Sequence, residues 1–483
     1  MKKKEGALVL ANKVNTQQKT GYVQTKEFVF YLAAIFFYTM MTGIVGSYRQ
    51  DYLVNVLQLT EDQTSFYNSF LSVAGFVMSF FYAMIIDNHK IKKNGKFVPI
   101  VNMVAIPMGI VTLLMFVTPK GLTGALLMIY LITIGLLHGA CCSFGNAINL
   151  VSFVMSPDSR ERDKVISFKS ISSAVGNSAP LVVTLVIGIF VKDKATLFIA
   201  STALICVVGT FITLMGMRFV KERIDYTQEK KNPLEGFLDV IKNKYAWIII
   251  VSETLKNFRQ IATYMGVFLA AALLGSTSKF LLFGLPTGIG TAVGMLVINF
   301  LLKKFNAKVL YIASGIYSII ANTAAFAVGY MYFKTESGVL QIVFIVFLFL
   351  IGLQFGASNL LPSMFQADVL ESIELQTKGK RLDAALPFVI GLGTMISGTI
   401  ASGLAPKILY GSSSIIQYVQ PTDAIPDPVQ SLHTKVMMLF FYTIFHGIMM
   451  FLAGVPFFFY KLTGKTKENV HNQVLAQREA IKK

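Results

Sequence analysis

Three ionisable residues stand inside one long apolar run at 245–274, where Glu253, Lys256 and Arg259 follow one another at three-residue spacing. On a helix this spacing places them on neighbouring faces. Charged groups inside a membrane are costly and usually face a protein interior or a wet cavity. We expect Lys256 or Arg259 to bind an anionic solute, with Glu253 as partner or proton carrier. The alternatives are a structural network and a position at the cytoplasmic mouth of the helix.

Amide and aromatic side chains supply further candidate contacts for a solute. Amides offer paired donors and acceptors that suit hydroxyls and carboxylates, and tyrosine rings can stack on a ligand. The candidates in the apolar runs are Asn146, Asn149, Gln354, Asn359, Tyr38 and Tyr264. Hydrogen bonding between helices explains the amides equally well, and 40 Phe and 19 Tyr would line almost any cavity with rings.

Two histidines in apolar runs, His138 and His446, could titrate near neutral pH and relay protons. We assign proton coupling to Glu253 and His138; a hydrogen-bonded packing role is the alternative. The three cysteines have no metal-ligand spacing, and the chain has neither an HExxH motif nor a Gly-rich phosphate loop. We therefore expect no metal, no cofactor and no enzyme activity.

The composition is that of a membrane protein. Of the 483 residues, 54% are hydrophobic and 14% are charged, and the mean hydropathy is +0.61. Apolar stretches of about 20 residues cross a hydrocarbon core of about 30 Å. The net charge of +18 is concentrated in one set of loops, which favours topogenic residues facing anionic lipid and excludes nucleic acid as the partner.

The apolar runs predict an all-α membrane protein with twelve transmembrane helices in two pseudo-symmetric six-helix bundles, the major facilitator fold. We place the bundles at 27–217 and 245–462, the tails at 1–26 and 463–483, and a connector at 218–244. The expected helices are 28–48, 64–86, 99–117, 122–155, 165–191, 196–217, 245–274, 279–302, 309–333, 340–366, 382–410 and 435–460.

Charge and internal repetition support this map. The tails and one set of loops hold about four times as many Lys and Arg residues as the opposite loops, among which we count Arg49, so both termini are expected in the cytoplasm. Asn149 precedes Asp158 by the spacing at which Asn359 precedes Asp368, and we expect these asparagines to close helices 4 and 10. Such an echo is typical of parallel-repeat transporters.

Three stretches together resemble the glycoside–pentoside–hexuronide:cation symporters, the melibiose-permease-like branch of the major facilitator superfamily. They are Asp87-Asn88 with Gly95-Lys96-Phe97 and Pro99; Asp158-Ser159-Arg160-Glu161-Arg162-Asp163 with Ser167-Phe168-Lys169; and Pro362-Ser363-Met364 with Ala367-Asp368 and Thr377-Lys378-Gly379-Lys380-Arg381. Each lies in the loop where the family carries it. The resemblance implies a sugar transporter.

The chain departs from that family at its cation site. The family's paired helix 2 carboxylates fall near Gly75 and Ser79, and its helix 11 lysine falls near Met395. The basic residue that opens helix 5 is kept in kind as Lys169, a substrate-binding candidate by this resemblance. The missing carboxylates favour proton coupling or no coupling over Na⁺.

Acidic residues at helix ends beside basic loops suggest gates that close the cytoplasmic side and open when the halves rock. The candidates are Asp87, Asp158, Arg160, Arg162, Asp368, Lys378 and Arg381. Helix capping or a topogenic role is the alternative reading of these residues.

By resemblance, we expect a monomeric multi-pass secondary transporter of the plasma membrane that moves a sugar or glycoside by alternating access, with a small-molecule substrate, a proton and lipid as its partners. The alternative is an organic-anion transporter or exporter using Lys256 and Arg259. A transport-dead sensor and a polytopic membrane enzyme are minor alternatives.

Overall fold

The computed structural model describes residues 22–88, 95–119, 121–156, 159–223, 237–377, 385–422, 425 and 428–481. Every regular element in these ranges is a helix, which confirms the predicted all-helical class. Ten helical spans in them are long and apolar enough to cross a membrane. Helices suit that solvent because they satisfy their own backbone polar groups.

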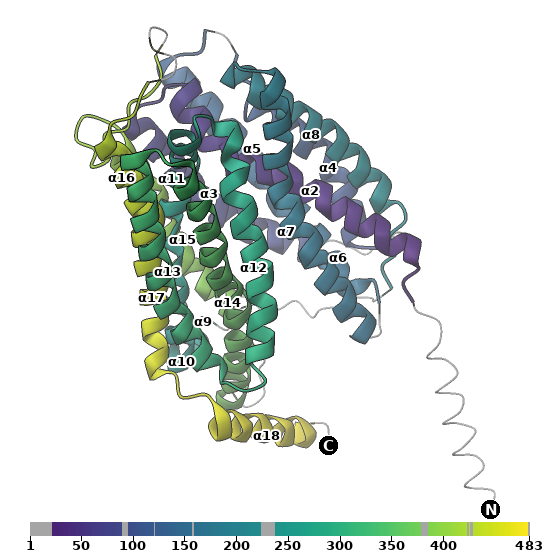
Figure 1. Cartoon of the computed structure of the whole chain (residues 1–483). Coiled ribbons are helices and arrows are strands. Elements are labelled where there is room, and N and C mark those ends of the chain that lie inside the picture. Colours follow the sequence, from purple (N-terminus) through teal and green to yellow (C-terminus); the bar gives the residue numbers. More distant parts are fainter. Residues whose placement is uncertain are drawn as a thin grey trace, which may run out of the picture.

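The first half of the chain forms a bundle of six rods (Figure 1). In order they are α2 (Thr25–Asp51) with its π-helical continuation η2 (Tyr52–Val56), α3 (Glu61–Asn88), α4 (Phe97–Leu114), α5 (Gly124–Gly145) with α6 (Ala147–Val154), α7 (Ser159–Phe190), and α8 (Lys194–Met217).

The second half repeats the plan after a short helix, α9 (Phe237–Lys242). Its rods are α10 (Lys244–Asn257) with α11 (Gln260–Leu274); η3 (Thr277–Phe280) with α12 (Leu281–Leu301); α13 (Ala307–Thr335); α14 (Gly338–Gln376); α15 (Ala385–Leu409); and α16 (Leu432–Phe440), η4 (Phe441–Phe445), α17 (His446–Gly454) and η5 (Val455–Phe459) in series. A last helix, α18 (Gly464–Ile481), lies across the end of this bundle (Figure 1).

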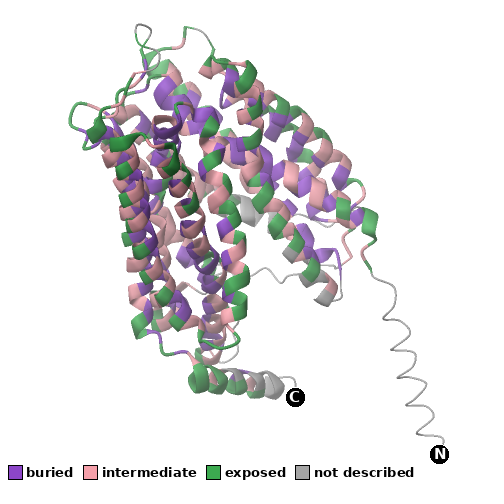
Figure 2. Ribbon diagram, viewed as in Figure 1, coloured by how far each residue is buried: buried purple, intermediate pink, exposed green. Residues whose placement is uncertain are grey.

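The twelve expected rods are therefore all present among the described residues. Two of them, α3 and the interrupted α10–α11, add to the ten apolar spans. Large apolar side chains such as Phe190, Val207 and Leu296 are exposed on the outer surface, and Figure 2 shows exposed residues along the outward faces of the helices. Such faces are suited to lipid contact.

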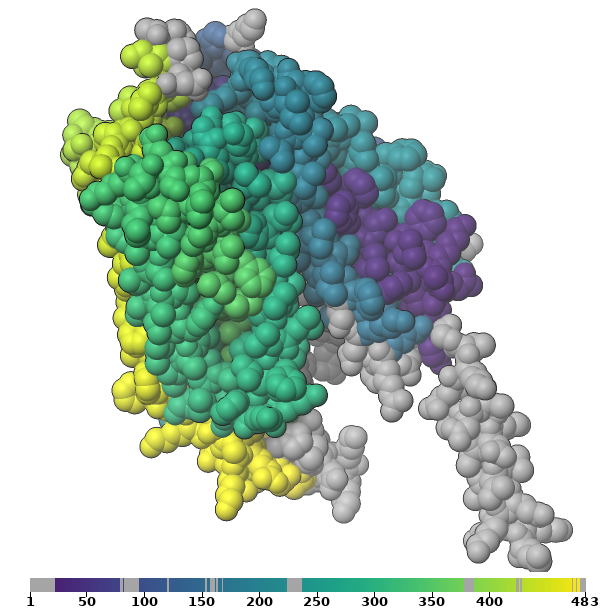
Figure 3. Space-filling model, in the orientation of Figure 1, coloured from purple at the N-terminus to yellow at the C-terminus, as the bar shows by residue number. Residues whose placement is uncertain are grey.

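The two halves pack together from one end, which we call the closed end, as far as the stacked rings of Phe76 and Phe388. There α3 packs on α15, and α7 packs on η3 and α12. Hydroxyl groups contribute to the contact: Ser65 Oγ donates to the Gly403 carbonyl at 2.6 Å and Ser69 Oγ to the Thr399 carbonyl at 3.3 Å. Lys407 of α15 also pairs with Asp62 of α3 at 2.8 Å. Towards the opposite end, where α2 begins and α18 lies, the halves diverge (Figure 1), and the space-filling view is notched between them (Figure 3). We call this the open end.

The segment between α15 and α16 crosses the closed end from the second half to the first. Tyr418 Oη donates to Asn55 Oδ1 at 3.2 Å, and Gln420 Nε2 donates to the Val54 carbonyl at 2.8 Å. Gln58 Nε2 donates back to the Pro421 carbonyl at 3.0 Å. The segment therefore ties the π-helical end of the first rod to the second half.

Several expected boundaries were wrong. Helix 4 is broken at Asn146, and helix 7 is broken at 258–259. Helix 10 continues to Gln376, so Asn359 lies within α14 and does not close it. The C-terminal tail forms α18. Arg49, counted among the loop residues, is buried inside α2.

Candidate functional site

The seventh rod is interrupted at the point where its charged residues lie. The backbone N–H of Phe258 bonds to the Leu255 carbonyl and that of Arg259 to the Lys256 carbonyl, at 3.2 and 3.1 Å. These bonds span three residues instead of four, so the α-helical ladder changes register here. Asn257 Nδ2 anchors the break to α15 by donating to the Thr394 carbonyl at 2.7 Å.

Glu253 and Lys256 form an ion pair on α10. Lys256 Nζ lies 2.6 Å from one Glu253 carboxylate oxygen and 2.5 Å from the other. Their side chains are 13% and 15% exposed, respectively. Lys256 Nζ also lies 3.4 Å from the Ser358 carbonyl on α14. The two predicted charges therefore neutralise one another within the second half, which leaves Arg259 as the third member.

Arg259 has a different environment. Its Cζ lies 4.8 Å from the centre of the Phe355 ring, a cation–π contact across to α14. The same ring meets the His446 imidazole in an edge-to-face contact, with 5.0 Å between the ring centres. Within the described ranges, the Arg259 side chain makes no hydrogen bond and no ion pair. Its nitrogens are not fully buried. Arg259 is half-buried, so its guanidinium is partly accessible and its donors are available.

The amide candidates separate into two groups. Asn146, at the break of the fourth rod, is exposed and accepts from Asn149 Nδ2 at 2.8 Å. Asn359, mid-way along α14, is also exposed. Gln354 is only 3% exposed, and its Oε1 has no partner in the described part of the chain. Gln354 therefore belongs to the interior of the second half in this conformation.

Both predicted tyrosines are packed in the core. Tyr38 Oη donates to the Cys142 carbonyl at 3.4 Å, which ties the first rod to the fourth. Tyr264 is buried and stacks on Phe268 at 5.8 Å. His138 lies 3.7 Å from Cys142 Sγ through Nδ1. These residues are not brought together with Arg259 by any contact in the described ranges, and Lys169 lies partly exposed on α7.

Of the gating candidates, only the Asp368 side chain lies within the described residues. It pairs with Lys467 of α18 at 2.7 Å. The expected position at a helix end was wrong, because α14 continues eight residues beyond Asp368, and the pair joins two elements of the same half. Asp158, Lys378 and Arg381, and the side chains of Asp87, Arg160 and Arg162, lie outside the described residues.

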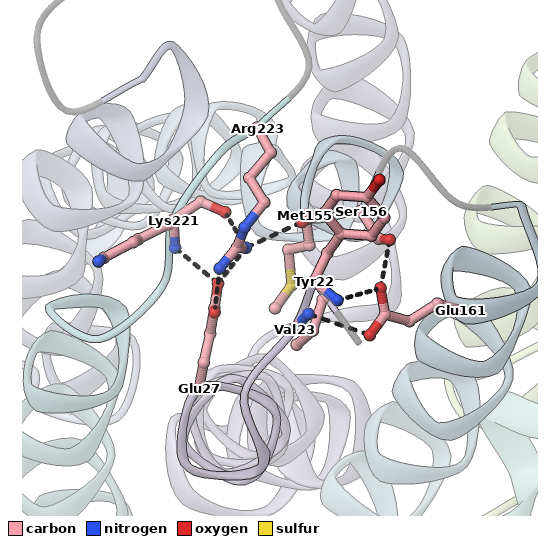
Figure 4. A network of polar contacts seen from close by, with 8 residues as sticks. All are labelled: Tyr22, Val23, Glu27, Met155, Ser156, Glu161, Lys221 and Arg223. Atoms are coloured by element: carbon pink, nitrogen blue, oxygen red, sulfur yellow. Dashed lines mark hydrogen bonds and ion pairs between the residues drawn. The ribbon is translucent and has the colours of Figure 1, made fainter. Parts of the chain in front are cut away.

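The sequence did not point to a second network, at the open end of the first half (Figure 4). Glu27 accepts from Arg223 Nη1 and Nη2 at 2.8 and 2.7 Å and from the Lys221 backbone N–H at 2.9 Å. These bonds raise the pKa of Arg223. Glu161 accepts from the backbone N–H groups of Tyr22 and Val23.

One signal could have found this network. Glu27 is an acidic residue in the first turn of the first apolar helix, where the helix dipole favours it, and a basic residue follows the sixth run. The network joins the start of α2 to the chain after α8 and to the start of α7. It is a structural tie within one half.

The comparisons with known proteins agree with this architecture. The MFS/sugar transport protein family matches residues 30–464. YagG of Escherichia coli (strain K12), named provisionally as a glycoside/cation symporter, is 22% identical over 412 residues, which cover 80% of this chain and 81% of YagG.

Among solved structures, the xylose transporter XylE from Escherichia coli in its inward-open form has a TM-score of 0.61 at 14% identity, covering 92% of this chain and 98% of that one. The nucleoside transporter NupG has a TM-score of 0.60 at 14% identity, covering 90% and 99%. These likenesses confirm the major facilitator fold. Because the family match extends over most of the chain, this protein belongs to the MFS/sugar transport protein family and is a secondary transporter of the sugar type, not an enzyme.

Proposed function

We propose that the solute binds between the two halves near the middle of the molecule, with Arg259 as its charged contact. The observation that carries this proposal is the partly accessible guanidinium held on Phe355 at the break of the seventh rod. An ionisable group at this depth is costly unless it faces water or a partner. Five N–H donors in a fixed fork suit the closely spaced oxygens of a sugar or a carboxylate.

The exposed amides support the same location. Asn146 from the first half and Asn359 from the second are exposed on membrane-length rods. Gln260 is exposed at the start of α11, at the break of the seventh rod. Polar side chains facing lipid would lose their hydrogen bonds, so we infer that they face the notch between the halves. Gln354 and Tyr264 then support this surface from behind, because both are buried in the core.

We propose a sugar or glycoside as the solute. YagG, which carries a glycoside/cation symporter name, supports that class. An organic anion is the second candidate, favoured by the absence of a carboxylate within ion-pair distance of Arg259 in the described ranges. A sugar is the first candidate because the proposed site has more exposed amide side chains than unpaired charged side chains.

We propose that the protein works as a monomer in the plasma membrane with both termini in the cytoplasm. The open end then faces inward, and rocking of the halves exposes the site alternately to each side. Coupling to a proton, or no coupling, is favoured over Na⁺ because Gly75 and Ser79 stand where the family carries carboxylates. Glu253 and His138 stay the candidate proton carriers.

The test is uptake into proteoliposomes of labelled sugars, glycosides and organic acids, with and without a Na⁺ or pH gradient. Removing a charge-assisted hydrogen bond weakens binding by about 1.5–3 kcal/mol, roughly 10- to 100-fold. We expect Arg259→Gln to lose that factor in kcat/KM and Arg259→Lys to retain part of it. Arg218→Gln, an exposed arginine beyond α8, is the matched control. Wild-type uptake by a folded Arg259→Gln protein would refute this site.

A further inference from the structure

A buried carboxylate lies at the closed end, outside the central site. Asp51 is the last residue of α2, where the rod continues as a π-helical turn. Asp51 is buried, with only 1% of its surface exposed. Asn55 Nδ2 donates to one carboxylate oxygen, Oδ1. The other oxygen, Oδ2, is sealed from solvent and has no hydrogen-bond partner in the described part of the chain.

This carboxylate faces the contact between the halves. The Thr277 hydroxyl, in η3 of the second half, lies near the carboxylate and favours its charged form, although Thr277 Oγ1 is buried with no partner at full hydrogen-bond geometry. Tyr48, one turn earlier on α2, meets Phe280 of η3 edge to face at 6.3 Å. Its own hydroxyl is also sealed without a partner. Parting of the halves here would bring water to Asp51.

The cations around Asp51 do not pair with it. Arg49 points the other way: it donates to the Met115 carbonyl, and its Nε and Nη2 donate to Tyr67 Oη at 3.3 and 3.2 Å. Lys194, at the start of α8, acts on the carboxylate only through its field. Two further lysines at this end donate to backbone carbonyls. Lys192 Nζ donates to the Gly188 carbonyl, and Lys279 Nζ donates to the Leu274 carbonyl.

A carboxylate in this position is far more costly charged than neutral. Burial of an ion without an opposite charge in contact removes its hydration, and one amide hydrogen bond replaces little of it. With a proton on Oδ2 the group becomes a neutral donor beside the unpartnered Thr277 hydroxyl. In the parted state, water would solvate the ion and the proton would leave.

We propose that Asp51 is a proton-binding site of the closed end, occupied while the halves are in contact and released when they part. The proposal rests on the rocking motion of the proposed function. Because the proton enters and leaves at the same end, this site carries no proton across the membrane. It instead makes the conformational equilibrium depend on the pH at that end: acid keeps the closed end shut.

Spin labels at the open end report the motion. Lys221→Cys and Lys304→Cys place one label on each half, at exposed positions, in a background that lacks Cys141, Cys142 and Cys206. Pulsed electron–electron distance measurements are made on purified protein from pH 5 to pH 9. As pH rises, we expect the short-distance population, in which the open end is closed up, to grow at the expense of the long-distance one. Their ratio should rise by at most about tenfold per pH unit, as release of one proton requires.

Asp51→Asn keeps the size and the neutral form of the group, so we expect its distances to stay long at every pH. Asp193→Asn, an exposed carboxylate at the same end that bonds to Thr196 of its own helix, is the control and should titrate like wild type. A pH-independent wild type, or an Asp51→Asn protein that still titrates, overturns the proposal. A shift that follows Na⁺ against choline at fixed pH would assign the site to Na⁺ instead. Uptake in proteoliposomes, measured separately, tells whether the proposed function itself fails.

Discussion

In the described part of the chain, the ion pair of Glu27 with Arg223 in the first half and that of Glu253 with Lys256 in the second are built differently. In the first half, Glu27 and Arg223 meet through two parallel bonds at the open end. Backbone groups complete the set, because Glu27 also accepts from Lys221 N and Arg223 Nη1 donates to the Met155 carbonyl at 2.9 Å. In the second half, Glu253 and Lys256 have each other and one carbonyl at 3.4 Å.

This difference separates a structural tie from a site that can rearrange. A charge pair whose remaining donors and acceptors are all satisfied fixes a single geometry. A pair with few other partners, one turn from the partly accessible Arg259, can exchange partners when a solute arrives. The second half therefore holds the chemistry, and the network around Glu27 holds the first half together.

Breaking the pair of the second half should have the largest effect on stability. Lys256→Met leaves the Glu253 carboxylate buried without its partner, which destabilises proteins by about 3 kcal/mol. We expect a clear fall in the apparent Tm in detergent. In the double variant Glu253→Gln/Lys256→Met no charge is left alone, so most of the lost stability should return. A double variant as unstable as Lys256→Met would contradict the pairing.

Breaking the Glu27–Arg223 pair of the first half should have the second-largest effect on stability. Glu27→Gln removes the anion that Arg223 holds, yet Arg223 stays partly exposed and can be hydrated, so we expect about 2 kcal/mol of destabilisation. Thermal unfolding measures this loss, and KM for the solute should be unchanged. Glu61→Gln, an acidic residue at the other end of the same half, serves as the control. A raised KM in Glu27→Gln would show that the comparison between the halves is wrong.

An exposed carboxylate gives the smallest effect. Asp193 caps α8 by accepting from the Thr196 N–H at 2.8 Å and from its hydroxyl at 2.6 Å. These Thr196 bonds lower the pKa of Asp193, so their contribution is present above the ordinary pKa of about 4 and is lost as pH falls through the lowered value. Asp193→Ala should cost about 1 kcal/mol at pH 7 and less in acid, whereas Asp193→Asn, which still caps, should melt near wild type.

The sequence predicted the rods but not their interruptions or true ends. The length of an apolar run reflects the part of a helix that crosses the hydrocarbon core, and not the full length of the helix. Helix 10 was therefore expected to stop at Gln366, where hydropathy falls, although α14 continues through Asp368 to Gln376. The break at Asn146 lies inside an apolar run, where composition carries little signal. The break at 258–259 lies among Lys256, Asn257, Arg259 and Gln260, whose polar character was interpreted as a site and not as an interruption.

The charged candidates could be recognised from the sequence because charges are costly in a membrane. The sequence did not reveal which residues they contact. The contact of Arg259 with Phe355, and the position of Asp51 opposite Thr277, depend on how rods far apart in the chain pack together. Spacing along one helix cannot give that information. The helical tail was recognisable in principle, since Val470 and Val474 recur at four residues and pack against the second half.

Where α3 meets α15, hydroxyl groups of Ser65, Ser69 and Thr399 hold the closed end beside its apolar contacts. When α3 and α15 separate, each of these bonds can be exchanged for one to water, at a net change of only about 0.5–1.5 kcal/mol. This stretch of the contact therefore exposes little apolar surface when the two helices separate. The two conformations of the carrier can thus lie close in free energy, so that binding of a single solute or a single proton is enough to shift the equilibrium between them.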